Sequence, residues 1–261
     1  MRIIDAHMHT IGHRKLKASK YSKEMKKYGV DYAIDITDNK PSNGKDLDLA
    51  LKVLKGNKRV FVIGSVDILL DDLNYMHKKL DNLFKRNKIR GIKIFPGHDP
   101  IYPTDERLIP FYKLCIKHNY PLIVHTGVNE RHPEVAKYND PKYIAKIAKK
   151  YPKLKIIIAH YFFQKMDYCY KITKKYKNIS FDTSGLADRW VQKMAGGREK
   201  VKKILEKTVK DGKKVIFGTD WPCPGCTVEG HIELVNSLNI GKKEKEDIFF
   251  NNANKIFKLK K

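Results

Sequence analysis

Short apolar runs rich in β-branched residues alternate along this chain with longer segments in which apolar residues recur every three or four positions. The runs have the length of buried strands, and the longer segments have the period of amphipathic helices. Eight strands are predicted in this way, at residues 2–9, 30–37, 59–66, 89–95, 120–126, 154–160, 178–184 and 214–220. Helices are predicted at 22–29, 46–56, 72–87, 105–119, 140–152, 165–176 and 199–212, and a last helical region covers about 229–258.

The spacing of these elements predicts the fold class. Successive strand ends lie 23 to 37 residues apart, which is the length of one strand and its crossover helix. Eight such units in 261 residues predict a single α/β domain over 1–261, a (β/α)₈ TIM barrel with an extra C-terminal helix. A doubly wound open sheet is the alternative. We favour the barrel, because no glycine-rich phosphate-binding sequence follows the first strand.

The first strand ends in the sequence IIDAHMHT, residues 3–10, with two histidines one residue apart. Side chains alternate between the two faces of a strand. We therefore expect His7 and His9 to project together with Asp5 below them, and Ala6 and Met8 to face the other way. Two imidazoles on one face can hold one metal ion, although paired histidines are also common as plain polar strand residues.

Polar residues recur at the predicted ends of three further strands. His125 ends the fifth, His160 the sixth and Asp220 the eighth. Active sites of such barrels lie at the carboxyl ends of the strands, and closing the barrel brings the eighth strand beside the first. Each residue alone could have a purely structural role, such as a histidine that is hydrogen-bonded to a loop carbonyl. Together, imidazoles and a carboxylate are the ligands that zinc and similar divalent metals prefer.

The same residues carry a family resemblance. The ordered sequences DAHMH, GIKIFP, a histidine after PLIV, another in IIIAH, then GTDWP and NNANKIF resemble the amidohydrolase superfamily. The resemblance is to Amidohydrolase family 2, which includes the aminocarboxymuconate-semialdehyde decarboxylase type, and it spans essentially the whole chain. It implies one divalent metal, usually zinc, held by His7, His9, His125 and Asp220. It also implies that His160 bonds the water or the substrate, and that the reaction is hydrolysis or non-oxidative decarboxylation.

The expected enzyme is a metal-dependent hydrolase that uses a metal-activated water, with Mn²⁺, Fe²⁺ or Co²⁺ as alternatives to Zn²⁺. Asp220 would take the water proton and pass it to the leaving group. Asp5 would support a ligand or fill the barrel. Lys93 should face the barrel if Ile92 and Ile94 face the helices. It would then contact a substrate anion or form a buried ion pair, and a carbamate bridging two metals is the less favoured reading.

The loops beyond the strands should select the substrate, which we expect to be a small carboxylate, ester, lactone or amide. An arginine suits a carboxylate, and Arg189 is our candidate for this contact. The loops are short, which predicts a shallow pocket unless the partner of a homodimer covers it. The other loop candidates are His13, Arg14, His98, Arg131, His132 and Trp190.

The four cysteines, at 115, 169, 223 and 226, are too few for a disulfide framework. Together with the absence of a signal-peptide pattern, they lead us to expect a cytoplasmic protein. In the sequence CPGC, Cys223 and Cys226 are either ordinary loop residues or half of a zinc or redox site. We favour the ordinary reading because no second such pair exists.

The net charge of +25 comes from lysines spread over the predicted helices, without an arginine-rich block. Nucleic acid is therefore an unlikely partner, and the charge instead favours small anionic substrates. No apolar run is long enough to span a membrane. A nuclease-like metal hydrolase and a non-catalytic binding barrel are the lower-ranked alternatives, and a non-oxidative decarboxylase ranks above both.

Overall fold

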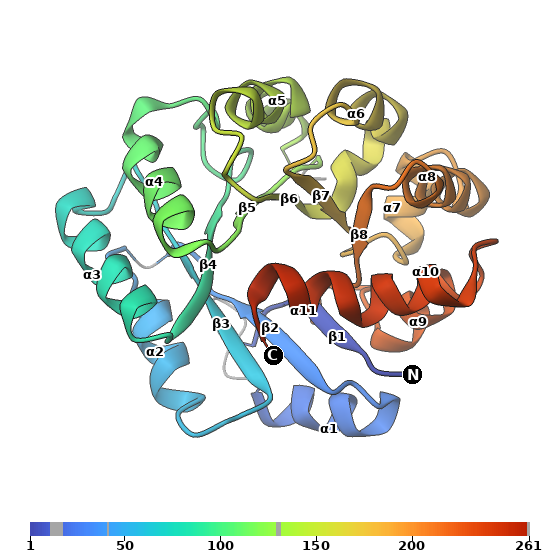
Figure 1. Ribbon diagram of the computed structural model, residues 1–261, viewed down its shortest axis with the longest axis horizontal. Coiled ribbons are helices and arrows are strands. Elements are labelled where there is room, and N and C mark those ends of the chain that lie inside the picture. The colour runs from blue at the N-terminus through green and yellow to red at the C-terminus, as the bar shows by residue number, and fades with distance from the viewer. Residues whose placement is uncertain (11–17, 41, 129–131, 260–261) are drawn as a thin grey trace.

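The computed structural model describes residues 1–10, 18–40, 42–128 and 132–259. Its eight strands lie in chain order in one parallel sheet, β1 beside β2 and so on to β8. Figure 1 shows the strands arranged around a central axis with the helices outside them. The strands are β1 (Ile4–Met8), β2 (Tyr32–Ile36), β3 (Val60–Ser65), β4 (Ile89–Ile94), β5 (Leu122–Val124), β6 (Ile156–Ile158), β7 (Ile179–Asp182) and β8 (Lys214–Ile216).

Backbone hydrogen bonds join the two ends of this sheet. The N–H of Ala6 donates to the carbonyl of Phe217 (2.9 Å), and the N–H of His9 donates to the carbonyl of Trp221 (2.7 Å). The first strand therefore lies beside the segment that continues the eighth. The predicted barrel is confirmed, and the open doubly wound sheet is excluded.

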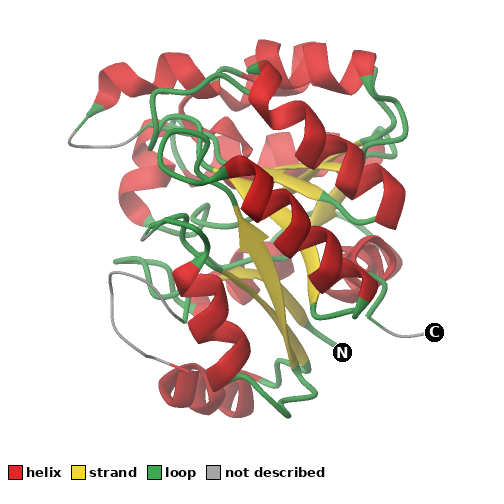
Figure 2. Cartoon of the chain, turned by 90° about the vertical axis from the view of Figure 1, so that its left-hand side faces the viewer, coloured by secondary structure: helices red, strands yellow, loops and turns green. Residues whose placement is uncertain are grey.

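Helices surround the barrel on its outside, and Figure 2 shows them on both sides of the yellow strands. Among the described residues, no helix has the length and apolar character needed to cross a membrane. The helices are α1 (Ala18–Tyr28), α2 (Lys45–Val53), α3 (Leu73–Lys85), α4 (Ile109–His118), α5 (Pro141–Lys150), α6 (Met166–Thr173), α7 (Arg189–Met194), α8 (Arg198–Lys210), α9 (Val228–Asn236), α10 (Lys242–Glu246) and α11 (Asn252–Phe257). Short 3-10 segments span Glu106–Leu108, Pro133–Asn139 and Ala159–Lys165, and a π-helical turn spans Asp247–Asn251.

Helix α7 was not predicted, because its six residues are too few to show a helical period. Its start is fixed by Asp188, whose side chain accepts a hydrogen bond from the N–H of Val191. A capping aspartate stabilises the first turn of a helix. Arg189 and Trp190 therefore lie in a helix rather than in the loop where the sequence analysis placed them.

The buried side chains form two apolar groups. The larger one lies between the strands and the surrounding helices, and the smaller one fills the barrel. The smaller group takes alternate residues of the strands, such as Ile34 and Ile36, and is completed by Phe250 and Phe257 from the C-terminal region. Helix α11 and the turn before it contact β8 and β1, so they close the amino-terminal end of the barrel.

The predicted orientation of β1 was wrong for Asp5 and Ala6. Ala6 belongs to the group that fills the barrel, whereas Asp5 accepts hydrogen bonds from Tyr21 of α1 and from Thr219. The register between β1 and β2 shifts between Asp5 and Met8. Such a bulge interrupts the alternation of faces, so that Asp5 does not lie below the two histidines.

Candidate metal centre

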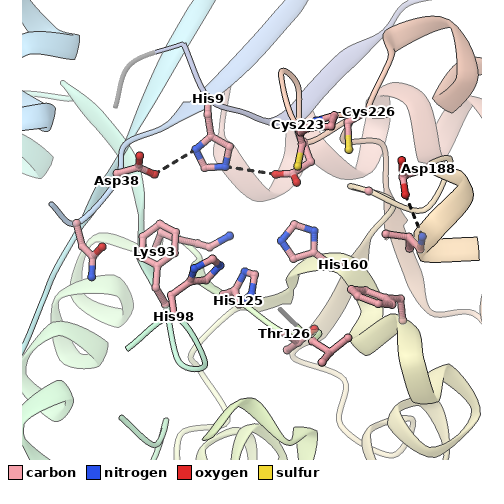
Figure 3. A pocket seen from close by; sticks show the side chains of 18 of the residues that line it. His9, Asp38, Lys93, His98, His125, Thr126, His160, Asp188, Cys223 and Cys226 are labelled. Atoms are coloured by element: carbon pink, nitrogen blue, oxygen red, sulfur yellow. Dashed lines mark hydrogen bonds and ion pairs between the residues drawn. The ribbon is translucent and has the colours of Figure 1, made fainter. Parts of the chain in front are cut away.

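A pocket of about 660 Å³ lies at the carboxyl ends of the strands. This volume is ordinary for a small-molecule site and does not match the shallow pocket expected from short loops. Figure 3 shows the pocket with histidines approaching its centre from several sides. Its lining residues are His9, Thr10, Asp38, Asn39, Lys40, Lys93, Phe95, His98, Asp99, His125, Thr126, Val128, His160, Phe163, Gly185, Asp188, Trp190, Val191, Asp220, Cys223, Pro224 and Cys226.

The imidazole of His7 is held by its Nδ1 atom. This N–H donates to Oδ2 of Asp182, the last residue of β7, over 2.8 Å, and both side chains are buried. An acceptor at Nδ1 fixes the tautomer and leaves the lone pair of Nε2 for another partner. The contact therefore prepares the Nε2 atom of His7 to bind a metal.

His9 and His160 are held in the same way. The Nδ1–H of His9 donates to the carbonyl of Ile36 (2.8 Å). The Nδ1 atom of His160 lies 2.9 Å from Oγ of Ser184, whose hydroxyl donates to Asp182. In each of these two rings Nε2 is again the nitrogen left for the pocket. This is the arrangement expected of metal-binding histidines.

Asp220 lies among these rings. Its Oδ1 is 3.6 Å from Nε2 of His7 and 3.4 Å from Nε2 of His9. Donor atoms of His7, His160 and Asp220 all lie within 4.8 Å of one another. These three residues come from the ends of β1, β6 and β8. The predicted approach of residues more than 200 positions apart is therefore present in the fold.

The protonation states suit cation binding. Burial first, and then the charge of Lys93, lower the pKa of His7 to about 3, and burial lowers the pKa of His160 as well. Burial alone would raise the pKa of Asp220, but His160 and His9 outweigh it and hold that pKa well below its usual range. At neutral pH the site thus offers neutral imidazoles and an ionised carboxylate, the forms that bind a metal.

His9 carries the opposite shift. Burial would lower its pKa, but the hydrogen bond and the charge of Asp220, with the charge of Asp38, raise it. Figure 3 shows His9 between Asp38 and the carboxylate to which it is joined by a dashed line. A cation at Nε2 would take the place of the proton that this nitrogen shares with Asp220.

His125 lies on the same rim, between His98 and His160 (Figure 3). Its ring centroid is 4.9 Å from that of His160 and 4.2 Å from that of His98. Neither His9 nor His125 belongs to the group of three whose donors share the 4.8 Å range. The predicted ligand role of His125 therefore stays a prediction, whereas His160, which was assigned to the water or the substrate, is as close as a ligand.

Lys93 faces the barrel as predicted. Its side chain is completely buried, and its Nζ lies 3.2 Å from Nε2 of His7. Burial lowers the pKa of Lys93 to about 8 despite the nearby carboxylates of Asp182 and Asp220. Ile92 and Ile94, on either side of it in β4, belong to the apolar group under the helices. The amine is thus placed to contact whatever occupies the space in front of His7.

Asp182 is the site residue that the sequence analysis missed. Its Oδ2 accepts from His7, and its Oδ1 accepts from the N–H of His160 and from Ser184. It therefore positions two candidate ligands at once. The strand-end rule did not find it, because the seventh strand was predicted at 178–184 and β7 ends at Asp182. Only the contacts across the barrel single Asp182 out.

Asp5 supports the site from outside the pocket. It accepts from the backbone N–H groups of His7 (3.2 Å) and Thr219 (3.0 Å). Burial raises the pKa of Asp5 to about 6, although the hydroxyls of Thr219 and Tyr21 oppose this. The carboxyl group thus ties the carboxyl end of β1 to the segment that leads to Asp220.

Only some of the predicted loop residues line the pocket. His98 and Trp190 line the pocket, whereas Arg189 is exposed and is not among the lining residues. His132 is exposed, and its Nδ1 atom lies 3.6 Å from Oε1 of Glu134. Three more candidates, His13, Arg14 and Arg131, lie outside the described residues.

Solved structures of similar fold cover nearly the whole chain. An uncharacterised TIM-barrel protein from Bordetella bronchiseptica is 18% identical, with a TM-score of 0.78 and 99% of each chain covered. A probable 2-pyrone-4,6-dicarboxylic acid hydrolase from Acinetobacter baumannii, with citric acid bound, is 15% identical, with a TM-score of 0.71 and coverage of 99% and 100%. A dihydroxybenzoic acid decarboxylase from Polaromonas sp. JS666, with bound manganese and 2-nitroresorcinol, is 15% identical, with a TM-score of 0.73 and coverage of 98% and 97%.

No curated protein matches the chain in sequence. The family model Amidohydro_2, described as amidohydrolase, matches residues 4–259. This match covers all eight strands and every residue of the candidate site, and it confirms the resemblance found in the sequence. The chain belongs to the amidohydrolase family.

Proposed function

We propose that this protein is a metal-dependent hydrolase that acts on a small, anionic carboxylate, ester, lactone or amide. The observation that carries the proposal is the convergence of His7, His160 and Asp220, with His9 in contact with Asp220, at the carboxyl end of the barrel. The Nδ1 atoms of these buried imidazoles are already hydrogen-bonded. A metal ion is therefore the natural partner of each Nε2 atom.

His7, His9, His125 and Asp220 are the ligands we propose, and His160 lies close enough to join them. The donor set is nitrogen and carboxylate oxygen without sulfur, which suits Zn²⁺ and also Mn²⁺, Fe²⁺ or Co²⁺. We propose a single ion, most consistent with Zn²⁺. Bound there, the ion would polarise a substrate oxygen and lower the pKa of a water.

The chain itself would move the proton. Asp220 is ionised and borders the pocket, so its carboxylate accepts the proton of the attacking water and then donates it to the leaving group. His160 would hold the attacking water, which donates a hydrogen bond to Nε2 because the Nδ1–H of this ring is already engaged with Ser184. Lys93 would stabilise the negative charge that develops on the substrate oxygen from the β4 side, because its Nζ lies beside His7.

The charges of the lining argue against the nuclease-like alternative. Four aspartates, namely Asp38, Asp99, Asp188 and Asp220, face the pocket, and Lys40 is already paired with Asp99 at 3.1 Å. Carboxylates around a pocket repel the repeated phosphates of a nucleic acid. A small substrate with one carboxylate, directed to Lys93, meets less repulsion.

Non-oxidative decarboxylation is the second candidate. Phe95, Phe163 and Trp190 form an aromatic part of the pocket wall, which suits a flat ring such as that of an aromatic acid. The dihydroxybenzoic acid decarboxylase described above acts, by its name, on such a ring. Asp220 would then first take up a proton from water and deliver it to the ring carbon, from which the carboxylate leaves as carbon dioxide.

The test begins with metal content. Protein purified without chelator should contain a divalent metal, one equivalent of which belongs to the histidine site, and stripping with a chelator should abolish turnover until metal is restored. The double variant His7→Ala with His9→Ala should lose this equivalent of metal and its turnover. The exposed His132→Ala is the matched control and should keep both. A His7/His9 variant that retains its metal and its rate contradicts the proposal.

A substrate screen separates the two reactions. Small esters, lactones and amides are followed by acid release, and aromatic carboxylic acids by release of carbon dioxide. Acid release that depends on the added metal supports hydrolysis. Metal-dependent release of carbon dioxide without acid release contradicts hydrolysis and supports decarboxylation. Release of neither product from any of these classes by the metal-loaded protein would count against both.

A further inference from the structure

The segment that follows β8 carries two cysteines for which the proposed function has no use. Cys223 and Cys226 both line the pocket, and neither is part of a disulfide. Figure 3 shows their sulfur atoms on the same side of the pocket, across from the group of His98, His125 and Lys93. Cys226 is 4% exposed, so its sulfur is sheltered by the loop rather than presented to solvent.

Two successive turns bring these sulfurs together with Asp220. The N–H of Cys223 donates to the carbonyl of Asp220 (2.9 Å), and the N–H of Cys226 donates to the carbonyl of Cys223 (3.0 Å). Pro224 and Gly225 occupy the centre of the second turn, and Gly225 has a φ of 77°. Proline followed by a residue of positive φ is the signature of a type II turn. Gly225 thus supplies the positive φ that this turn requires, and Pro224 suits the position before it.

The result is a compact group of donors. One atom each from Asp220, Cys223 and Cys226 lies within 4.8 Å of the other two. Two thiolates on one zinc lie about 3.8 Å apart for tetrahedral geometry and Zn–S bonds of about 2.3 Å. The three side chains thus need shifts of only about 1 Å to bind one ion.

The surrounding charge also favours a cation. Asp220 and Asp188 both act as negative charges on Cys226, and Asp188 packs against the turn so closely that Gly225 has no room for a side chain. Reactive, redox-active cysteines lie instead in electropositive surroundings that stabilise the thiolate. An ion with affinity for sulfur would neutralise the thiolates and the carboxylates together.

We propose that Cys223, Cys226 and Asp220 form a second site, for a thiophilic divalent cation of the Zn²⁺ class, on the wall of the pocket. Two sulfurs and one oxygen leave the fourth tetrahedral position for water or substrate. The Nε2 atoms of His7 and His9 face Oδ1 of Asp220, so this carboxylate would bridge the second ion to the histidine-bound one. The inference rests on the proposed function only through this shared aspartate.

The experiment uses the full chain, reduced, stripped of metal and titrated with Cd²⁺, which binds thiolates as Zn²⁺ does and gives a sulfur-to-metal absorption band in the ultraviolet. The band should appear as each chain takes up its ions, with release of the two thiol protons. Cys223→Ser and Cys226→Ser should each weaken it. The double variant should lose it and bind one Cd²⁺ fewer per chain.

The matched control is Cys115→Ala, which removes a buried thiol of α4 whose sulfur lies 3.6 Å from the carbonyl of Pro121, away from the pocket. This variant should keep the band. The proposal is overturned if the wild-type protein shows no band, if the band survives in the Cys223/Cys226 double variant, or if freshly purified protein holds the two cysteines as a disulfide.

The histidine variants separate this inference from the proposed function. His7→Ala with His9→Ala should lose the histidine-bound ion and keep the sulfur-to-cadmium band. If these variants keep all their metal, the proposed function fails although the cysteine site stands. If the cysteine double variant keeps its full number of ions, the second site fails although the histidine site stands.

Discussion

The two ends of the barrel are built from the same eight strands but have opposite chemistry. At the amino-terminal end, Ile4 and its neighbours pack against Phe250 and Phe257 of the C-terminal region. At the carboxyl end, the last residues of the strands and the residues that follow them include imidazoles, carboxylates and the buried Lys93. The first end removes apolar surface from water, whereas the second holds charged groups away from water at a cost in free energy.

The difference shows how one strand can contribute both to the apolar packing of the barrel and to the candidate site. In β1 the side chains change from Ile4 and Ala6, which fill the barrel, to His7, whose ring is bonded to Asp182 of β7. The charged groups of the rim are tolerated because each has a partner, such as Asp182 for His7. The barrel is thus stabilised at the end that lacks the site, and the site can be changed without removing that packing.

The largest effect is expected for Asp220→Asn at the rim. The amide cannot accept and return the proton, so we expect turnover to fall by about 10³-fold or more, while the midpoint of thermal unfolding changes little. Rates measured on the substrate found in the screen, with metal content in parallel, test this. A variant that keeps most of its rate would show that Asp220 is not the proton carrier.

At the opposite end, Phe257→Ala should reduce the free energy of unfolding by about 3–5 kcal/mol, because Phe257 is completely buried in the group that fills the barrel. The folded variant should still bind metal and turn over substrate at the wild-type rate. Lys255→Ala, on an exposed position of the same helix, should change stability by no more than about 0.5 kcal/mol. Loss of metal in the folded Phe257 variant would show that the two ends are coupled.

A smaller effect is expected for Asp182→Asn, which keeps the shape of the side chain but weakens its acceptors for His7 and His160. Metal affinity should fall by about 10- to 100-fold, the range for residues that orient metal ligands. A competition titration with a chelator measures it. Unchanged affinity would mean that the imidazoles are oriented without this carboxylate.

The smallest effect is expected for Arg189→Ala. Its side chain is exposed and outside the pocket lining, so we expect KM and kcat to change by less than about twofold. A rise in KM of tenfold or more, with kcat unchanged, would instead give this arginine the substrate contact that the sequence suggested.

Much of the fold could be predicted because the barrel repeats one simple pattern. Each strand is a short apolar run and most helices have a clear period, so all eight strands were found near their observed positions. Helix α7 was missed, since it is set by the capping of Asp188 rather than by periodicity. The bulge in β1 was missed as well, because a one-residue shift of register leaves no trace in the alternation of so short a strand.

The candidate site was predicted in part for a related reason. His7, His9, His125, His160 and Asp220 stand out because they are polar residues at the ends of apolar strands. Asp182 stands at a strand end too, but its importance comes from accepting hydrogen bonds from two other strands. Which residues of α7 line the pocket could not be predicted either, because this depends on which side of the helix faces inward. Arg189 is exposed, whereas its neighbour Trp190 lines the pocket.

The sequence by itself determined the strand order, the parallel barrel and the end of the barrel at which chemistry is possible, because these follow from local periodicity and from the fixed direction of βα units. Only the tertiary structure decided which donors meet. Distances between side chains on different strands depend on the register of the closed sheet, and a shift of one residue changes which face each side chain takes. That is why Asp5 does not lie below the two histidines, and why Asp182 contacts both His7 and His160.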